Sequence, residues 1–268
     1  MAGAEAGSDA PKAPEKTPEK AAEKTAGKAP GKAQAPAQPQ FYRTPEPLNS
    51  VKHADLGIAE QTDYGFAAGA TSVLVTAPEI ALAARTYPIV FTDTEVPTPV
   101  AVLGVQQGKN LFVSDGKWEP RAYVPAYIRR YPFAFVEQAD RKRLLLCVDT
   151  ASPMVTRDTP QKFFEDGKES ALTTRALEFC RNFQAHYDVT LKLGRMLREN
   201  DLLAKRRADI RLGNKDRTAV RDFLVIDEPK LAKMTDQKFL AFRKAGTLAF
   251  LYFHLMSLAN FRDLALRG

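Results

Sequence analysis

The spacing of apolar and polar residues divides the chain at about residue 40. Residues 1–40 contain no Phe, Tyr, Trp, Leu, Ile or Val, and their only large apolar side chain is that of Met1. Such a segment cannot bury enough apolar surface to offset the entropy of ordering. We therefore predict a disordered Lys/Ala/Pro/Glu-rich tail over residues 1–40 and one globular domain over residues 41–268.

Short apolar runs bounded by turn residues predict strands in the first half of this domain, beginning with residues 64–68 and 73–75. The pattern Arg-x-Tyr-Pro-x-x-Phe occurs twice, at residues 85–91 and 129–135, and each copy is followed by a turn and a second apolar run. Each copy therefore predicts a β-hairpin, and the sequence around Asp115-Gly116 predicts another between them.

Thr76-Ala77-Pro78-Glu79 is a helix-start signature, with Thr76 as N-cap and Glu79 completing a capping box, so a short helix is expected over residues 79–86.

The apolar spacing becomes helical in the second half. Residues 172–203 predict one long helix, or two helices joined near Asp188. A hairpin over residues 208–227, turning at Gly213-Asn214, comes next. Helices are then expected over residues 230–234, 236–245 and 247 to about 266. Strands first and helices later predict an α+β fold, with antiparallel β-hairpins from the first half packed against helices from the second half.

Composition and charge narrow the possible classes of protein. The net charge is +7, and the tail holds six Lys against five acidic residues, so the domain is only mildly basic. A dedicated nucleic-acid-binding protein carries denser charge of one sign, and we expect no nucleic-acid partner.

Cellular location is predicted from cysteine use and from apolar run length. Cys147 and Cys180 lie in apolar runs, which favours buried free thiols and a reducing compartment. No apolar run approaches the roughly 20 residues of a membrane span, and no secretory signal pattern is present. We therefore expect a soluble cytoplasmic protein without a transmembrane segment.

Several segments together resemble the bacterial SapC family, which is distinct from the peptide-transporter permease of similar name. The matching segments are Pro47-Leu48-Asn49-Ser50-x-x-His53, Ala84-Arg85-x-Tyr87-Pro88-Ile89-Val90-Phe91, Val102-Leu103-Gly104, Asn110-Leu111-Phe112-Val113, Gly116-x-Trp118, Tyr123-Val124-Pro125-Ala126-Tyr127-Ile128-Arg129-Arg130-Tyr131-Pro132-Phe133 and His254-Leu255-x-Ser257-Leu258. The resemblance spans residues 41–266. Through the family's name it implies a link to bacterial surface layers (S-layers, surface arrays) or to envelope processes, without a defined reaction or catalytic residues.

The candidate ligand-binding residues come mostly from the aromatic and basic segment 118–135. Arginine beside aromatic rings can hold a carboxylate, a phosphate or a sugar. The alternative is a packed sheet in which Arg129 or Arg130 pairs with a core carboxylate such as Asp149. The candidates are His53, Trp118, Tyr123, Tyr127, Arg129, Arg130 and Tyr131.

The remaining polar candidates are weaker. His53 lies in a polar loop and could act as a general base, whereas His254 lies in an apolar helix and fits a core position. Asp149 and Asp227 follow apolar strands, where helix caps and turns are commoner than catalytic groups. The histidines lack zinc-ligand spacing and no phosphate-binding loop is present, so we expect no cofactor and no metal.

Two interpretations of the function follow. The first is an accessory protein that binds a protein partner or a small anionic or sugar-like ligand and that can form oligomers through its apolar C-terminal helix. The alternative is an enzyme of unknown reaction, in which His53, Arg129 or Arg130 and a carboxylate converge in one pocket lined by Tyr, Arg and His.

Overall fold

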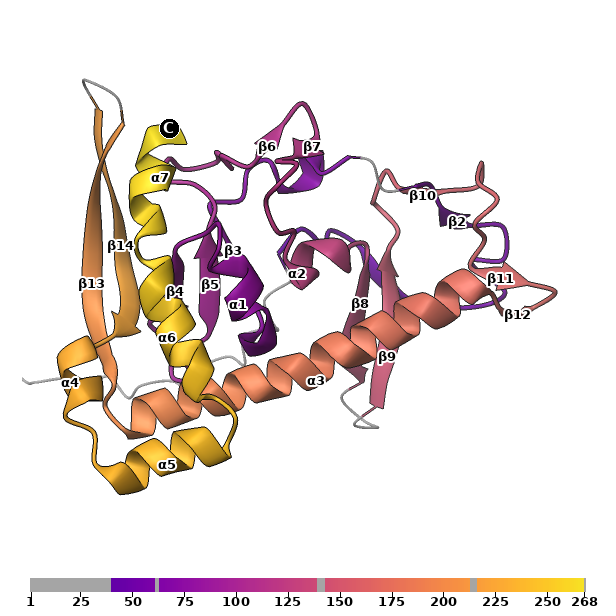
Figure 1. The fold of residues 1–268 in the computed structure, drawn as a ribbon. Helices are drawn as coiled ribbons and strands as arrows, with labels where there is room; N and C mark the ends of the chain where they lie inside the picture. Colours follow the sequence, from indigo (N-terminus) through magenta and orange to yellow (C-terminus); the bar gives the residue numbers. More distant parts are fainter. Residues whose placement is uncertain (1–39, 61–62, 139–142, 213–215, 268) are drawn as a thin grey trace, which may run out of the picture. The chain divides into compact units, whose positions relative to one another are not determined.

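The computed structural model describes residues 40–60, 63–138, 143–212 and 216–267 (Figure 1). The chain divides into two units, Met1–Ala37 and Gln38–Gly268. Apart from residue 40, the predicted tail lies outside the described residues, as does the predicted turn at Gly213-Asn214. Within Gln38–Gly268 the fold is α+β, with several small antiparallel sheets and a long central helix, which confirms the predicted fold class.

A five-stranded antiparallel sheet has the order β13-β14-β4-β5-β3. Its strands are β3 (Ser72–Leu74), β4 (Ile89–Thr92), β5 (Pro99–Val102), β13 (Leu203–Leu212) and β14 (Asp216–Ile226). A three-stranded sheet has the order β1-β9-β8, with β1 (Pro45–Pro47), β8 (Phe133–Gln138) and β9 (Arg143–Asp149). Two-stranded pairs join β2 (Gly57–Ile58) to β10 (Val155–Thr156), β6 (Val113–Ser114) to β7 (Lys117–Trp118), and β11 (Phe164–Glu165) to β12 (Lys168–Glu169).

The two Arg-x-Tyr-Pro segments both form the expected hairpins, β4–β5 and β8–β9. The Asp115-Gly116 turn joins β6 to β7, also as expected, and both turn residues have positive φ. The two Tyr-Pro hairpins lie in different sheets, because β4 also pairs with β14 whereas β9 also pairs with β1. Each hairpin is therefore completed by a strand from a distant part of the sequence.

The helix α3 (Ala171–Glu199) is continuous, without a break at Asp188, and runs past both larger sheets in Figure 1. Its N-terminus is capped by Ser170, whose hydroxyl oxygen accepts a hydrogen bond from the backbone N–H of Thr173 at 3.3 Å. Near its other end the backbone approaches a neighbouring loop so closely that a Cβ atom on Gly194 would lie 2.1 Å from the carbonyl oxygen of Pro97. Glycine is therefore required at that crossing.

Three predicted elements differ from the structure. Residues 64–68 contain a 3₁₀ turn, η1 (Gly65–Ala67), and not a strand, because the N–H groups of Ala67 and Ala68 donate to the carbonyl oxygens of Tyr64 and Gly65, three residues earlier. The helix expected over residues 79–86 is the short pair η2 (Ala77–Glu79) and α1 (Ile80–Ala83), and its capping box is present.

The helix expected from residue 247 to about residue 266 is divided into α6 (Leu248–Ser257) and α7 (Asn260–Arg267). At the junction, the side-chain amide of Asn260 donates to the carbonyl oxygens of Ala84 at 2.7 Å and Tyr87 at 3.0 Å. The remaining helices are α2 (Ala126–Arg129), α4 (Glu228–Ala232) and α5 (Asp236–Lys244). Asp227 caps α4, because its carboxylate accepts from the N–H of Lys230 at 3.2 Å, as expected for a turn-forming residue.

The main core lies where α3 and α6 pack with the five-stranded sheet, and it contains the fully buried His254. Nε2 of His254 accepts a hydrogen bond from the backbone N–H of Ile226 at 3.1 Å, and its ring lies 4.9 Å from that of Phe91. The interpretation of His254 as a core residue is therefore confirmed. Among the described helices, none is both long and apolar enough to cross a membrane.

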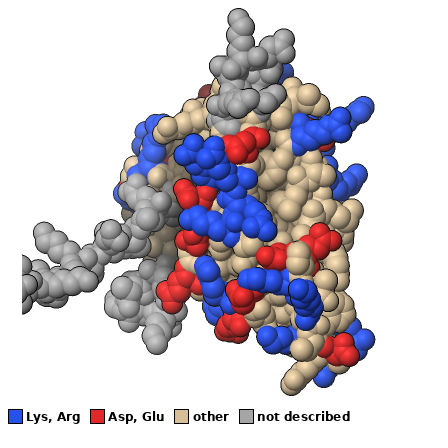
Figure 2. Space-filling view, turned by 90° about the vertical axis from the view of Figure 1, so that its left-hand side faces the viewer, with Lys and Arg blue, Asp and Glu red and all other residues tan. Residues whose placement is uncertain are grey.

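The outer face of the sheet at β13 and β14 carries interleaved charges (Figure 2). Asp93 pairs with Lys205 at 3.3 Å and with Arg198 at 3.7 Å, and Lys205 also pairs with Asp222 at 3.1 Å. Lys205 and Arg198 on this part of the surface therefore both have acidic partners.

Candidate functional site

The predicted ligand-binding residues divide by burial into two groups. The buried ones are His53, Trp118, Tyr127 and Tyr131, whereas Tyr123 and Arg130 are half-buried and Arg129 is exposed. Most of the aromatic side chains therefore pack inside the protein, where they engage a small number of polar groups.

The buried carboxylate of Glu79 organises the segment before α2. Its Oε1 accepts from the hydroxyl of Tyr123 at 2.7 Å and from the backbone N–H of Ala126 at 2.6 Å. Its Oε2 accepts from the N–H of Thr76 at 3.0 Å and from the Thr76 hydroxyl at 2.6 Å. One side chain thus completes the capping box and also joins α1 to the aromatic segment.

Arg129 is the cationic partner of this network. Its Nη2 donates to the Tyr123 hydroxyl at 3.0 Å and lies 4.0 Å from Oε1 of Glu79. Burial and the adjacent Glu79 carboxylate raise the pKa of Tyr123 to about 12. The Tyr123 ring is therefore held in place through its hydroxyl, which is occupied on both sides.

The expected core carboxylate partner of Arg129 is Glu79, at 4.0 Å, and not Asp149, the example that the sequence suggested. Asp149 accepts instead from the backbone N–H groups of Arg43 at 3.1 Å and Thr44 at 2.7 Å, and from the hydroxyl of Tyr131 at 3.1 Å. Its carboxylate therefore ties the segment before β1 to the end of β9. The strand-end position favoured a structural role, but sequence reasoning could not identify backbone N–H donors more than a hundred residues away.

The guanidinium of Arg130 lies between aromatic rings. Its Cζ is 4.4 Å from the ring centre of Tyr127, 4.3 Å from that of Phe183 and 5.7 Å from that of Tyr42. Its buried Nε has no hydrogen-bond partner in the part of the chain that the structure describes. Arg130 thus links α2, α3 and the segment before β1 through cation–π contacts.

Trp118 and Tyr87 fix the backbone of the segment that precedes α2. Its indole N–H donates to the Tyr87 hydroxyl at 3.1 Å, and that hydroxyl donates to the carbonyl oxygen of Tyr123 at 2.6 Å. Burial raises the pKa of Tyr87. The position of residue 123 is therefore fixed through its backbone as well as through its side chain.

His53 belongs to a separate cluster. Its Nδ1 accepts from the backbone N–H of Asn49 at 3.1 Å, and its Nε2 lies 3.5 Å from a carboxylate oxygen of Glu46. No contact between described residues joins His53 to Arg129 or Arg130. The structure therefore does not bring together the three groups that the enzyme interpretation requires.

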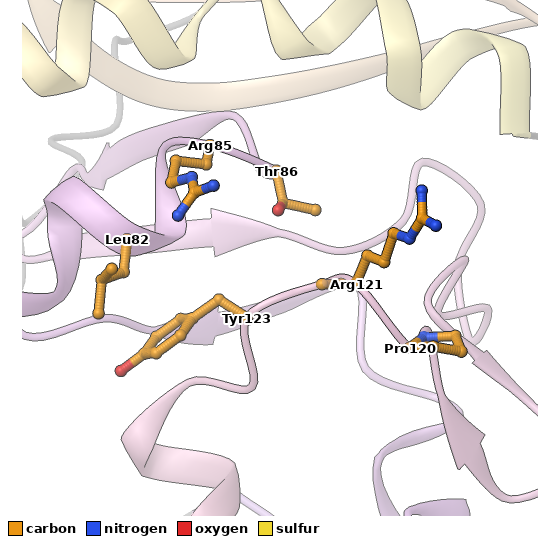
Figure 3. A pocket seen from close by; sticks show the side chains of 7 residues that line it. Leu82, Arg85, Thr86, Pro120, Arg121 and Tyr123 are labelled. Carbon is orange, nitrogen blue, oxygen red and sulfur yellow. The ribbon is translucent and has the colours of Figure 1, made fainter.

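An open cleft lies on the solvent side of Tyr123, with a volume of about 330 Å³ (Figure 3). We call it the arginine cleft, and its lining residues are Leu82, Arg85, Thr86, Pro120, Arg121, Ala122 and Tyr123. Arg85 and Thr86 follow α1 on one side, while Arg121 and Tyr123 lie on the facing segment.

The two arginines of this cleft differ from Arg129 and Arg130. Arg85 and Arg121 are exposed, and among the described residues neither side chain has a hydrogen bond, an ion pair or a cation–π contact. Arginine binds carboxylate and phosphate oxygens through two parallel hydrogen bonds. The cleft can therefore hold an anionic group, with the ring of Tyr123 as one wall.

Sequence reasoning missed both of these arginines as binding residues. Arg85 begins the first Arg-x-Tyr-Pro segment, and Arg121 lies within the aromatic segment beside Tyr123. The available signal was their position in distinctive motifs, but only the fold shows that they lack acidic partners.

The SapC family model matches residues 48–264, which is most of the chain. The protein therefore belongs to the SapC family, and the resemblance found in the sequence is confirmed. No curated protein and no solved structure matches this chain.

Proposed function

We propose that this SapC-family protein is an accessory binding protein that holds an anionic group of a ligand or partner in the arginine cleft. The supporting observation is that Arg85 and Arg121 line one cleft and that neither has an acidic partner in the part of the chain that the structure describes. An anion that engages one or both of them forms charge-assisted hydrogen bonds, which are stronger than hydrogen bonds between neutral groups.

The side chains that form the wall of the arginine cleft favour a ligand that has a flat or apolar part as well as an anionic group. The guanidinium of Arg129 lies over the Tyr123 ring, with Cζ 5.6 Å from the ring centre, and the same ring lines the cleft. Leu82, which is 48% exposed, lines the same cleft. Small-ligand sites range upward from about 300 Å³, so the cleft suits a small ligand or the end of a larger partner. A phosphorylated or carboxylated sugar fits this description.

The positions of the acid–base candidates favour binding over catalysis. The Glu79 carboxylate accepts four hydrogen bonds, so both of its oxygens are already occupied. His53 is buried in another cluster with Glu46 and Asn49. An enzyme would need such groups to converge where a substrate can reach them.

The biological setting that we propose rests on family membership and on the thiols. The family name supports a role in surface-layer or envelope processes, with a protein or a sugar-like molecule as the partner. The thiols of Cys147 and Cys180 are free and buried, which supports a reducing compartment such as the cytoplasm. Tyr252 and Met256, both exposed on α6, support contact with a second copy or another protein.

Titration calorimetry with phenyl phosphate tests the proposed anion site. We expect Arg85→Gln and Arg121→Gln each to weaken binding by about tenfold, which corresponds to the loss of one charge-assisted interaction. Arg195→Gln is the matched control, because Arg195 is also exposed but lies on α3, outside the cleft. No binding by the wild-type chain, or equal weakening by the control, would refute the proposal.

A further inference from the structure

A second cleft, with a volume of about 720 Å³, lies beside Tyr131. We call it the aromatic cleft, because Phe41, Phe66 and Tyr131 all line it. It shares no lining residue with the arginine cleft. A ligand in this cleft would therefore bind independently of the anion site proposed above.

The rings of the aromatic cleft are fixed by the fold. Phe66 stacks on Tyr131 with ring centres 4.3 Å apart, and Phe41 meets Phe66 edge-on at 5.5 Å. The Tyr131 hydroxyl donates to Asp149 inside the protein. The cleft therefore presents aromatic carbon and not a phenolic hydroxyl.

The backbone at Phe41 is strained. Its φ is 80°, a conformation that bulky side chains rarely adopt. Such strain persists only where surrounding contacts maintain it, and it occurs preferentially at ligand-binding sites. Here the contacts of the Phe41 ring with Phe66 and Tyr127 hold it in place.

Two opposite charges line the same cleft. Arg43 and Asp63 are both exposed, and neither has an ion-pair partner among the described residues. One carboxylate oxygen of Asp63 accepts from the backbone N–H of Gly65 at 2.6 Å, and the other oxygen has no hydrogen-bond donor among the described residues. The backbone N–H of Arg43 is held by Asp149, so the base of that side chain is also anchored.

We propose that the aromatic cleft binds a zwitterion of the α-amino-acid type that carries an apolar or aromatic side chain. Its carboxylate pairs with Arg43, and its ammonium pairs with Asp63 and faces the aromatic rings. Its side chain packs against Phe41 and Phe66. A purely anionic ligand would meet the Asp63 carboxylate, and a purely cationic ligand would meet Arg43, whereas a zwitterion satisfies both charges.

The test compares three ligands of similar shape by titration calorimetry with the full chain. They are L-phenylalanine, 3-phenylpropanoate (which lacks the ammonium group) and phenethylamine (which lacks the carboxylate). We expect L-phenylalanine to bind about tenfold more tightly than either analogue, since each analogue lacks one charge-assisted interaction. The measurements are repeated in Arg85→Gln/Arg121→Gln, so that binding in the arginine cleft does not contribute.

Two variants assign each charge to its partner. Arg43→Gln should weaken L-phenylalanine and 3-phenylpropanoate while leaving phenethylamine unchanged. Asp63→Asn, which keeps an acceptor for Gly65, should weaken L-phenylalanine and phenethylamine but not 3-phenylpropanoate. Equal affinity of the three ligands, unchanged selectivity in these variants, or no binding of L-phenylalanine at millimolar concentration would overturn the proposal.

Discussion

His254 should make the stability of the protein depend on pH between about pH 3 and pH 6.5. Its imidazole is fully buried, and burial lowers its pKa to about 3. Its Nε2 accepts from the N–H of Ile226, and a protonated ring would place two donors face to face there. The native state therefore holds this ring neutral, while the unfolded state titrates near the ordinary value of about 6.5.

The sign and the size of the effect follow from this difference. Below about pH 6.5 the unfolded chain takes up a proton that the native chain does not, so acidification favours unfolding. Between pH 7 and pH 5 the free energy of unfolding should fall by about 2 kcal/mol from this group alone. The loss should continue toward pH 3 and stop there, where the native ring also becomes protonated.

Urea unfolding followed by the fluorescence of Trp118, the single tryptophan, measures this dependence. His254→Gln is the comparison, because glutamine can accept from Ile226 but does not titrate. We expect the free energy of unfolding of the variant to fall by about 2 kcal/mol less than that of the wild type between pH 7 and pH 5. Equal pH dependence in the two proteins would refute the reasoning.

Three further substitutions test the packing of the candidate site and of α3, each measured by urea unfolding at pH 7. Glu79→Gln should lower the free energy of unfolding by about 2–3 kcal/mol, because the amide N–H₂ of glutamine would face hydrogen-bond donors that the carboxylate now accepts from. Glu178→Gln, at an exposed position on α3, is the control and should change the free energy of unfolding little. Equal effects of the two substitutions would contradict the hydrogen-bond network around Glu79. Arg130→Lys should lower it by about 1–2 kcal/mol through loss of stacking between aromatic rings, and an unchanged value would show that these contacts contribute nothing. Gly194→Ala should destabilise the protein by about 1–3 kcal/mol although alanine favours helices, and a stabilised variant would show that the contact with Pro97 relaxes freely.

Local patterns in the sequence predicted the elements whose signals are contained within a few residues. The capping box of Thr76 and Glu79 and the N-cap at Asp227 both form as their local patterns indicate. The paired Arg-x-Tyr-Pro segments form hairpins for the same reason. Their placement in different sheets could not be predicted, because each sheet is completed by strands from distant parts of the chain.

The candidate site shows the same limit. The capping box explains the hydrogen bonds that one carboxylate oxygen of Glu79 accepts. The second oxygen accepts from Tyr123 and Ala126, which only the tertiary fold brings close to Glu79. Arginines with similar sequence surroundings have different roles: Arg129 and Arg130 are engaged internally, whereas Arg121 has no such partner among the described residues. Whether a charge is satisfied or available for a ligand depends on these long-range contacts.

The binding proposal is tested most directly by the NMR signals of the arginine side-chain Nε–H groups during titration with phenyl phosphate. We expect the signals of Arg85 and Arg121 to shift in a saturable manner with one common dissociation constant, while those of Arg130 and Arg195 remain in place. Shifts confined to other arginines, or small shifts distributed over all exposed arginines without saturation, would contradict an anion site in the arginine cleft.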